Sequence, residues 1–229
     1  MAVEDNSTGK RYLYLILLAL VGFAGLTILA LKQPFLAFDL PVTRAIQSIT
    51  LPGFAEMMHI LTWIGSAPQV YVISIVFILG LLLSGWRWEA FMSAASLVLT
   101  AGLGMLVKFM IARPRPGAGL VRVTEILTDY SFPSGHVLFY TIFFGFLLYL
   151  TVTLAKPGIW QELSVILLGL MIALIGVSRI YAGHHWASDV LGAYLLGSIC
   201  LWITVSIYQG GKRTIFTEAD RIAGSDQQH

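Results

Sequence analysis

Three short segments of the sequence carry residue types that could act together on an anionic group. The residues in question, in chain order, are Lys108 and Arg115, then Pro133-Ser134-Gly135-His136, then Arg179, His185 and Asp189. Cations that converge with no acidic run beside them need an anion, and the planar guanidinium of arginine suits the geometry of phosphate. The first and third segments therefore indicate a phosphate-binding site.

The second segment has the composition of a helix start that could hold phosphate oxygens. Ser134 and Gly135 place free backbone N–H groups there, and glycine permits close approach. Ser134 could equally be an ordinary N-cap, and the two roles are compatible. His136 follows directly and could act as a general acid and base.

The third segment supplies a nucleophile and a carboxylate that could orient it. His185 and Asp189 are four residues apart and share one face if this part of the chain is helical. A carboxylate that reaches the imidazole fixes its tautomer and raises its nucleophilicity. Together with His136 and the cations, this set describes phosphoryl transfer through a covalent phosphohistidine.

In order and spacing, the three segments resemble the signature motifs of the type 2 phosphatidic acid phosphatase (PAP2) superfamily. The resemblance covers residues 108–189 by motif and about 11–209 by helix layout. It implies an enzyme, a phosphoric monoester or diphosphate hydrolase that needs no metal or other cofactor. Its membrane-bound members dephosphorylate lipids such as phosphatidic acid, phosphatidylglycerophosphate and polyprenyl diphosphates.

The resemblance also assigns roles to single residues. It implies that His185 attacks phosphorus, that Asp189 orients it and that His136 protonates the leaving alkoxide. The phosphate clamp that it implies consists of Lys108, Arg115, Ser134, Gly135 and Arg179. The preferred lipid stays open: a phosphatidic acid or phosphatidylglycerophosphate type is the first hypothesis and undecaprenyl diphosphate the second. A non-catalytic phospholipid-binding membrane protein is the alternative from another class.

Three further residues that can carry charge lie close to the motifs. His184 precedes His185, but the spacing from the neighbouring motif residues selects His185. Arg113-Pro114 duplicates Arg115-Pro116, and we expect Arg113 to help attract the lipid headgroup. Asp129 lies in the loop before the second motif, where solvation is the default and contact with a headgroup is the alternative.

The shortage of charge indicates a polytopic membrane protein. Only 26 of 229 residues are Lys, Arg, Asp or Glu, and 57 % are apolar, whereas a soluble domain carries about 25 % charged residues. Since a span needs about 20 apolar residues, we predict an all-α bundle of six transmembrane helices. The predicted spans are 11–32, 68–85, 88–111, 136–155, 161–181 and 187–209.

Short connections and tails complete the predicted organisation. Residues 41–49 and 54–64 have apolar positions at helical spacing and are predicted to be interfacial helices between spans one and two. Residues 1–10 form a predicted cytoplasmic segment, 11–209 the catalytic domain and 210–229 a polar, frayed tail. The first apolar run is interpreted as a retained span, because it ends in Leu31-Lys32 without a cleavage site.

The distribution of Lys and Arg predicts the orientation of the chain in the membrane once the residues of the site are left out of the count. A cytoplasmic N-terminus places seven Lys and Arg inside and seven outside. If Lys108, Arg115 and Arg179 serve the site, the outside count falls to four, which agrees with the positive-inside rule. We therefore expect both termini in the cytoplasm and the active site on the extracytoplasmic face of the cell membrane. A net charge of +2 gives no reason to expect nucleic acid as a partner, and the oligomeric state stays open.

Overall fold

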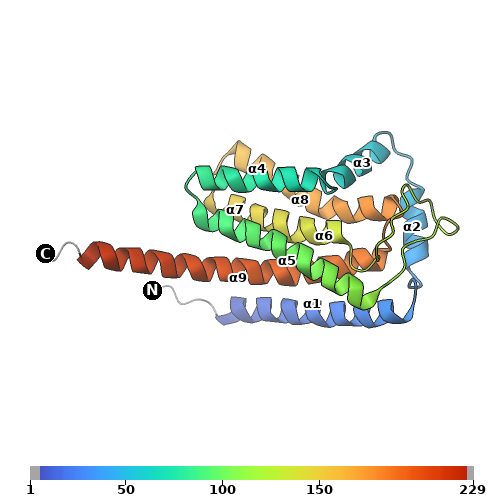
Figure 1. Cartoon of the computed structure of the whole chain (residues 1–229), viewed down its shortest axis with the longest axis horizontal. Helices are drawn as coiled ribbons and strands as arrows, with labels where there is room; N and C mark the ends of the chain where they lie inside the picture. The colour runs from blue at the N-terminus through green and yellow to red at the C-terminus, as the bar shows by residue number, and fades with distance from the viewer. Residues whose placement is uncertain (1–5, 226–229) are drawn as a thin grey trace.

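Helices account for all the regular structure in the described part of the chain. The structure is a computed structural model that describes residues 6–225, with side chains described for residues 10–214. Figure 1 shows most of the helices running roughly side by side along the long axis of the molecule. The helices are α1 (Asn6–Lys32), α2 (Asp39–Gln47), α3 (Phe54–Ile64), α4 (Gln69–Leu83), α5 (Arg87–Ile111), α6 (Gly135–Phe139), the π-helical turn η1 (Tyr140–Phe144), α7 (Gly145–Leu154), α8 (Ile159–Tyr181) and α9 (Ala187–Ser225).

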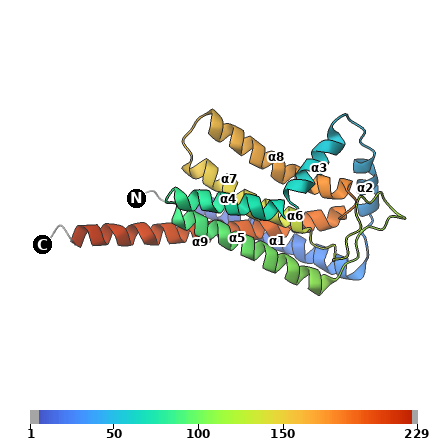
Figure 2. The same cartoon turned by 45° about the horizontal axis from the view of Figure 1, so that its top comes forward.

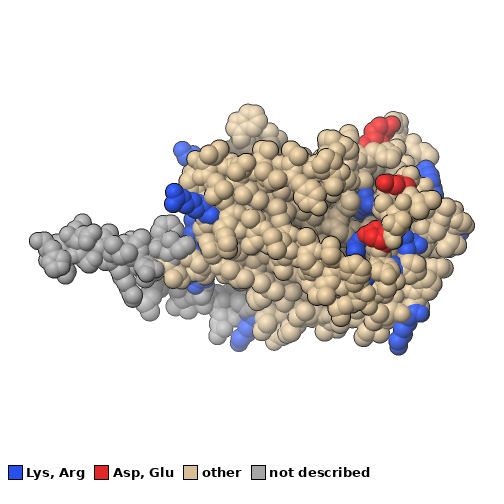
Figure 3. Space-filling model, viewed as in Figure 1, with Lys and Arg blue, Asp and Glu red and all other residues tan. Residues whose placement is uncertain are grey.

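Five to six segments are candidate membrane spans. The helices α1, α5, α8 and α9 each contain a window long and apolar enough to cross a membrane, as does the continuous segment Gly135–Leu154 made of α6, η1 and α7. The sixth candidate is the pair α3 and α4, bent by 62° at a short break. Figure 3 shows a broad surface without charged residues between two ends that carry them. The all-α transmembrane bundle predicted from the sequence is confirmed.

The second span differs in detail from its prediction. The α4 helix has 15 residues, which at 1.5 Å per residue is about 22 Å and falls short of the roughly 30 Å apolar core of a bilayer. The break lies at Gly65–Pro68, where proline cannot donate a helical hydrogen bond. Figure 2 shows α3 turning away from α4 toward α8. The helix predicted over residues 54–64 is present as α3, and it meets α4 at this bend.

The segment α6–η1–α7 forms the centre of the bundle. Buried residues make up 67 % of its apolar window, the highest share among the five unbroken candidate spans. Its aromatic residues stack on one another, as Phe139 does on Phe143 with ring centroids 5.2 Å apart. Helices α5, α8 and α9 pack around it, and α1 lies along α9 (Figure 1). The helix α9 runs on past residue 209 to Ser225, although a frayed tail was expected from residue 210.

Candidate active site

The three motifs meet at one end of the bundle because four helix termini lie there. Lys108 is in the last turn of α5, and Ser134 is at the N-cap position of α6 without a side-chain capping hydrogen bond. Arg179 is in the last turn of α8, and Asp189 is in the first turn of α9. Figure 1 places these ends beside α2 and the long loop that joins α5 to α6. Residues up to 81 positions apart in the sequence are thereby brought into one region.

His185 is buried with its Nε2 atom facing a cation. Arg115 Nη1 lies 3.2 Å from His185 Nε2, and because a guanidinium can only donate, Nε2 must accept. The proton of the neutral ring is then on Nδ1, which lies 3.6 Å from Asp189 Oδ2. Burial lowers the pKa of His185 well below its ordinary value, and the charges of Arg115 and Arg179 lower it further. The imidazole is therefore neutral at pH 7, and its Nε2 lone pair points toward Arg115.

Asp189 is held by hydrogen bonds and an ion pair from residues other than His185. Its Oδ2 accepts a hydrogen bond from the Trp186 backbone N–H at 2.8 Å and another from the Ser131 hydroxyl. Its Oδ1 forms an ion pair with Arg113 Nη1. The carboxylate is completely buried, so its position behind His185 is fixed by hydrogen bonds rather than by solvent.

Arg113 does not have the role expected for it. Its side chain is fully buried between the carboxylates of Asp39 and Asp189, with Arg113 Nη2 lying 3.0 Å from Asp39 Oδ2. A guanidinium enclosed in this way cannot meet an incoming headgroup, so the expectation that Arg113 attracts lipid is wrong. The duplicated Arg-Pro sequence contains one structural arginine, Arg113, and one arginine in the site, Arg115.

Asp39 is the residue of this region that the sequence interpretation overlooked. It is fully buried and accepts hydrogen bonds from the Ser188 backbone N–H at 2.8 Å and from the Ser188 hydroxyl at 2.7 Å. The backbone N–H of Leu36 donates to it at 2.7 Å. A sequence signal existed, because Asp39 is the only acidic residue between positions 6 and 55 and isolated charges beside a span are costly.

Lys108 and Arg115 are both bound to Asp129 in the loop before α6. Arg115 Nη2 donates to Asp129 Oδ1 at 2.7 Å, and Lys108 Nζ forms an ion pair with Asp129 Oδ2. Burial raises the pKa of Asp129, but the hydrogen bond and charge of Lys108, with Arg115, lower it to about 2. Asp129 is thus ionised and neutralises part of the positive charge of the site, in contrast to the solvated loop taken as the default.

Arg179 and Ser134 carry buried polar atoms that no other described side chain or backbone group satisfies. The atoms are Arg179 Nε, Arg179 Nη1 and Ser134 Oγ, and Arg179 is 2 % exposed. Buried donors are expensive to leave unpaired. Guanidinium and hydroxyl donors of this kind call for an oxygen-rich anion, which agrees with the predicted clamp. Ser134 and Asp189 are also in contact, since the Ser134 N–H lies 3.4 Å from the Asp189 carbonyl oxygen.

His136 approaches from α6 and contacts the bend between α3 and α4. Its Nε2 lies 3.2 Å from Ser66 Oγ, and the Ser66 hydroxyl itself donates to the Thr62 carbonyl at 2.9 Å. Gly65 makes room for the ring, because a Cβ atom there would come within 2.7 Å of His136 Cδ2. The bend in the second span thus shapes the surroundings of the predicted general acid.

His184 has a structural environment, unlike its neighbour. Its carbonyl oxygen accepts a hydrogen bond from Arg115 Nη1, and its ring Nε2 lies 3.0 Å from Thr124 Oγ1. Burial lowers the pKa of His184 to about 3, with contributions from Arg179 and Arg115. The His184 backbone and ring thus both have partners within the protein, and His185 stays the predicted nucleophile.

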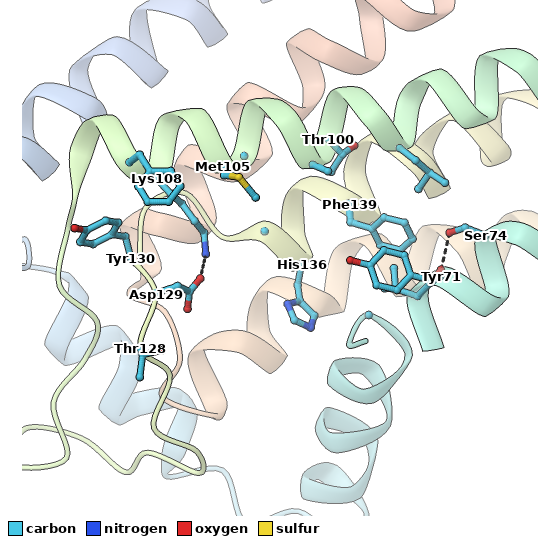
Figure 4. Close-up of a pocket in the computed structure, with 17 residues that line it drawn as sticks. Tyr71, Ser74, Thr100, Met105, Lys108, Thr128, Asp129, Tyr130, His136 and Phe139 are labelled. Carbon is cyan, nitrogen blue, oxygen red and sulfur yellow. Dashed lines mark hydrogen bonds and ion pairs between the residues drawn. The ribbon is translucent and has the colours of Figure 1, made fainter. Parts of the chain in front are cut away.

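A cavity of about 780 Å³ reaches the site between α4 and α5. Figure 4 shows Lys108 and Asp129 at one end of it, Ser74, Thr100 and Phe139 toward the other, and His136 between them. Exposed apolar side chains stand at its margin, among them Tyr71 at 64 %, Met105 at 62 % and Phe109 at 68 % exposure. The cavity therefore joins a polar end at the motifs to an apolar surface of the bundle. Across residues 10–214, no group of three or more His, Cys, Asp or Glu is arranged to hold a metal ion.

Comparison with known proteins identifies the family. The model of the PAP2 superfamily matches residues 89–213, more than half of the chain. The chain belongs to the PAP2 superfamily. This PAP2-type membrane phosphatase is 26 % identical over 180 residues to phosphatidylglycerophosphatase B of Bacillus subtilis, covering 76 % of this chain and 85 % of the relative. It is 36 % identical over 121 residues to an undecaprenyl-diphosphatase of Sulfolobus acidocaldarius, covering 51 % of this chain and about half of the relative, 53 %.

Solved structures agree on the PAP2 fold. The crystal structure of a transmembrane PAP2 type phosphatidylglycerolphosphate phosphatase from Bacillus subtilis superposes with a TM-score of 0.71. The identity is 22 %, and the match covers 86 % of this chain and 96 % of the other. The LpxE structure from Aquifex aeolicus gives a TM-score of 0.58 at 26 % identity, over 75 % and 96 % of the two chains. The family and fold predicted from the three motifs are confirmed.

Proposed function

We propose that this PAP2-type chain hydrolyses the terminal phosphate of a membrane lipid through a phosphohistidine formed on His185. The observation that carries the proposal is the set of buried donors without protein partners, on Arg179 and Ser134, beside a neutral His185. Such donors suit an anion with several oxygens. The lipid phosphate is the substrate class that the family implies.

The first chemical step forms a bond between His185 Nε2 and phosphorus. The Nε2 lone pair attacks while the bond from phosphorus to the lipid oxygen breaks. His136, which we propose takes up a proton when the phosphate dianion binds, gives that proton to the lipid oxygen, so the lipid leaves as an alcohol. Positive charge then develops on the His185 ring, whose Nδ1 faces Asp189 at 3.6 Å. Arg113 is shared by two buried carboxylates, which leaves one net negative charge to stabilise the ring.

The second step releases inorganic phosphate. His136, now neutral, takes a proton from water as the water oxygen attacks phosphorus and the bond to Nε2 breaks. The clamp residues Lys108, Arg115 and Arg179 stabilise charge on the phosphoryl oxygens in both steps. We propose that this chemistry needs no metal, so turnover should persist in EDTA.

The cavity between α4 and α5 supports lateral access for the lipid. Its apolar margin lies on the surface predicted to face lipid, while Lys108 and His136 line its inner end. A lipid could leave its chains in the bilayer and extend its phosphate toward His185. The glycerolipid substrates are favoured by the longer match, 180 residues, to a phosphatidylglycerophosphatase.

Undecaprenyl diphosphate is the second candidate substrate. The higher identity, 36 % over 121 residues, is to an undecaprenyl-diphosphatase. The site would meet a terminal phosphate in either case. A panel of phosphatidic acid, phosphatidylglycerophosphate, undecaprenyl phosphate, undecaprenyl diphosphate and sphingosine phosphate separates the two candidates by relative kcat/KM.

We propose that the site faces the extracytoplasmic side and that both termini are cytoplasmic. The burial of Arg113 inside the protein strengthens the charge argument. Once Arg113 is set aside with Lys108, Arg115 and Arg179, seven Lys and Arg inside face three outside, as the positive-inside rule requires.

A matched pair of histidine variants tests the nucleophile. His185→Gln should abolish phosphate release and the trapping of labelled phosphohistidine after an acid-free quench. His184→Gln makes the same change one residue earlier and should retain both. Labelled protein in His185→Gln would overturn the assignment, and a wild type that releases no phosphate would favour the non-catalytic lipid-binding alternative.

A further inference from the structure

Asp129 covers the two cations that the clamp needs. Its Oδ1 receives Arg115 Nη2 at 2.7 Å and Nε at 3.2 Å, its Oδ2 is paired with Lys108, and its backbone carbonyl accepts from Arg115 Nε at 2.9 Å. The Asp129 side chain is 56 % exposed, whereas those of Lys108 and Arg115 are 17 % and 11 % exposed. The carboxylate is thus the more exposed partner, and it lines the cavity together with Lys108 (Figure 4).

A substrate phosphate would need the same two cations. Arg115 Nη1 is 3.2 Å from His185 Nε2, so a phosphorus atom close to Nε2 brings phosphoryl oxygens within reach of Arg115. Like a phosphate, Asp129 offers two oxygens that together engage Arg115 and Lys108. Two anions on one pair of cations repel each other. A bound phosphate and the Asp129 carboxylate therefore compete for the positive charge of Arg115 and Lys108.

The charge of the incoming group decides how favourable this exchange is. Asp129 carries one negative charge, since its pKa of about 2 keeps it ionised at neutral pH. A phosphate monoester carries about −1.5 to −2 at pH 7. A phosphodiester carries a single charge, so its exchange with a carboxylate brings no electrostatic gain. The same cavity margin is open to every lipid of the bilayer, and abundant phospholipids are diesters.

Building on the proposed function, we propose that Asp129 is a specificity-determining residue that excludes phosphodiester lipids from the clamp. It acts as a resident monoanion that only a more highly charged terminal phosphate displaces. Substrate affinity is reduced by this competition, and the site in return stays free of the surrounding lipid.

The test compares Asp129→Asn with Glu125→Gln. Asparagine keeps the shape of the side chain and removes its charge. Glu125 is an exposed acid of the same loop with no ion pair to Lys108 or Arg115, so its variant controls for the loss of one negative charge. Each enzyme hydrolyses phosphatidic acid in mixed micelles with increasing mole fractions of phosphatidylglycerol, a diester.

The expected result is a several-fold lower KM in Asp129→Asn and competitive inhibition by phosphatidylglycerol at mole fractions that leave the wild type and Glu125→Gln unaffected. A higher KM with unchanged inhibition would mean that Asp129 positions the cations, and it would overturn the proposal. The proposal would also be overturned if Asp129→Asn had the same KM and the same inhibition by phosphatidylglycerol as Glu125→Gln. Failure of the proposed function is read separately, from a wild type that releases no phosphate.

Discussion

Replacement of Asp39 by asparagine should destabilise the fold far more than a single lost charge would suggest. Asp39 Oδ2 accepts from Leu36 N–H, Arg113 Nη2 and the Ser188 hydroxyl, and Oδ1 accepts from the Ser188 N–H. The amide of the Asp39→Asn variant has one oxygen and one NH2 group. In either orientation, therefore, an N–H group of this amide would point at another buried N–H donor.

The magnitude follows from the number of donors affected. Loss of a hydrogen bond to a charged group costs about 1.5–3 kcal/mol, and a buried donor left unpaired costs about 1–3 kcal/mol. A total of about 3 kcal/mol agrees with the cost of breaking a buried ion pair. For a chain of this length each kcal/mol lowers the Tm by about 2–4 °C, so the expected drop is about 6–12 °C.

Cys200 provides the assay without further engineering. It is the only cysteine in the chain and is 4 % exposed, so a thiol-reactive dye reports unfolding in detergent. Asp129→Asn is the matched control, because it removes the same charge from a half-exposed pair worth about 0–1 kcal/mol. A Tm for Asp39→Asn within about 3 °C of the wild type would refute the reasoning.

Two further predictions concern His136 and the histidine pair. Gly65→Ala should lower kcat about a hundredfold, because the new Cβ would lie 2.7 Å from His136 Cδ2 and 2.8 Å from Tyr140 Cε2 and would displace the imidazole. Gly80→Ala is the control, because its Cβ would meet nothing within 4 Å. Equal activity of the two variants would contradict the prediction. Burial holds the pKa of His184 at about 3, below its unfolded value of about 6.5, so the unfolded state binds more protons between these values and stability falls as pH drops below 6.5. The loss of folding stability due to His184 between pH 7 and pH 5 is about 2 kcal/mol. The Tm of His184→Gln should therefore fall less steeply with pH over that range than the Tm of the wild type. An unchanged slope would count against the lowered pKa of His184.

The spans and motifs were predictable because each is encoded locally. A run without charge fixes a membrane helix, and the limits of α5 and α8 differ from the predicted spans by at most two residues. The order of charged residues at the ends of these runs then indicated a common site. Neither inference needs knowledge of how the helices pack.

The supporting contacts were not predictable, since they depend on packing between distant elements. Asp39 contacts Ser188 across 149 positions, and no pattern in the sequence pairs them. The two arginines of the duplicated Arg-Pro sequence have the same neighbours along the chain, so only the fold distinguishes buried Arg113 from Arg115. Asp129 looked like an ordinary loop acid, because its partners Lys108 and Arg115 converge on it only in three dimensions.

The π-helical turn Tyr140–Phe144 sets the angular relation between the two halves of span four. A π-turn adds one residue to an α-helix, and each α-helical residue rotates the chain by about 100°. His136 and the packing face of α7 can therefore point in directions that a continuous α-helix would not combine. Deletion of one residue from this buried turn, which is fully apolar apart from Tyr140 and Thr141, would turn the imidazole away from the site by about a quarter of a revolution. The π-helical turn thus sets the rotation of α6, which carries His136, relative to α7, which packs in the bundle.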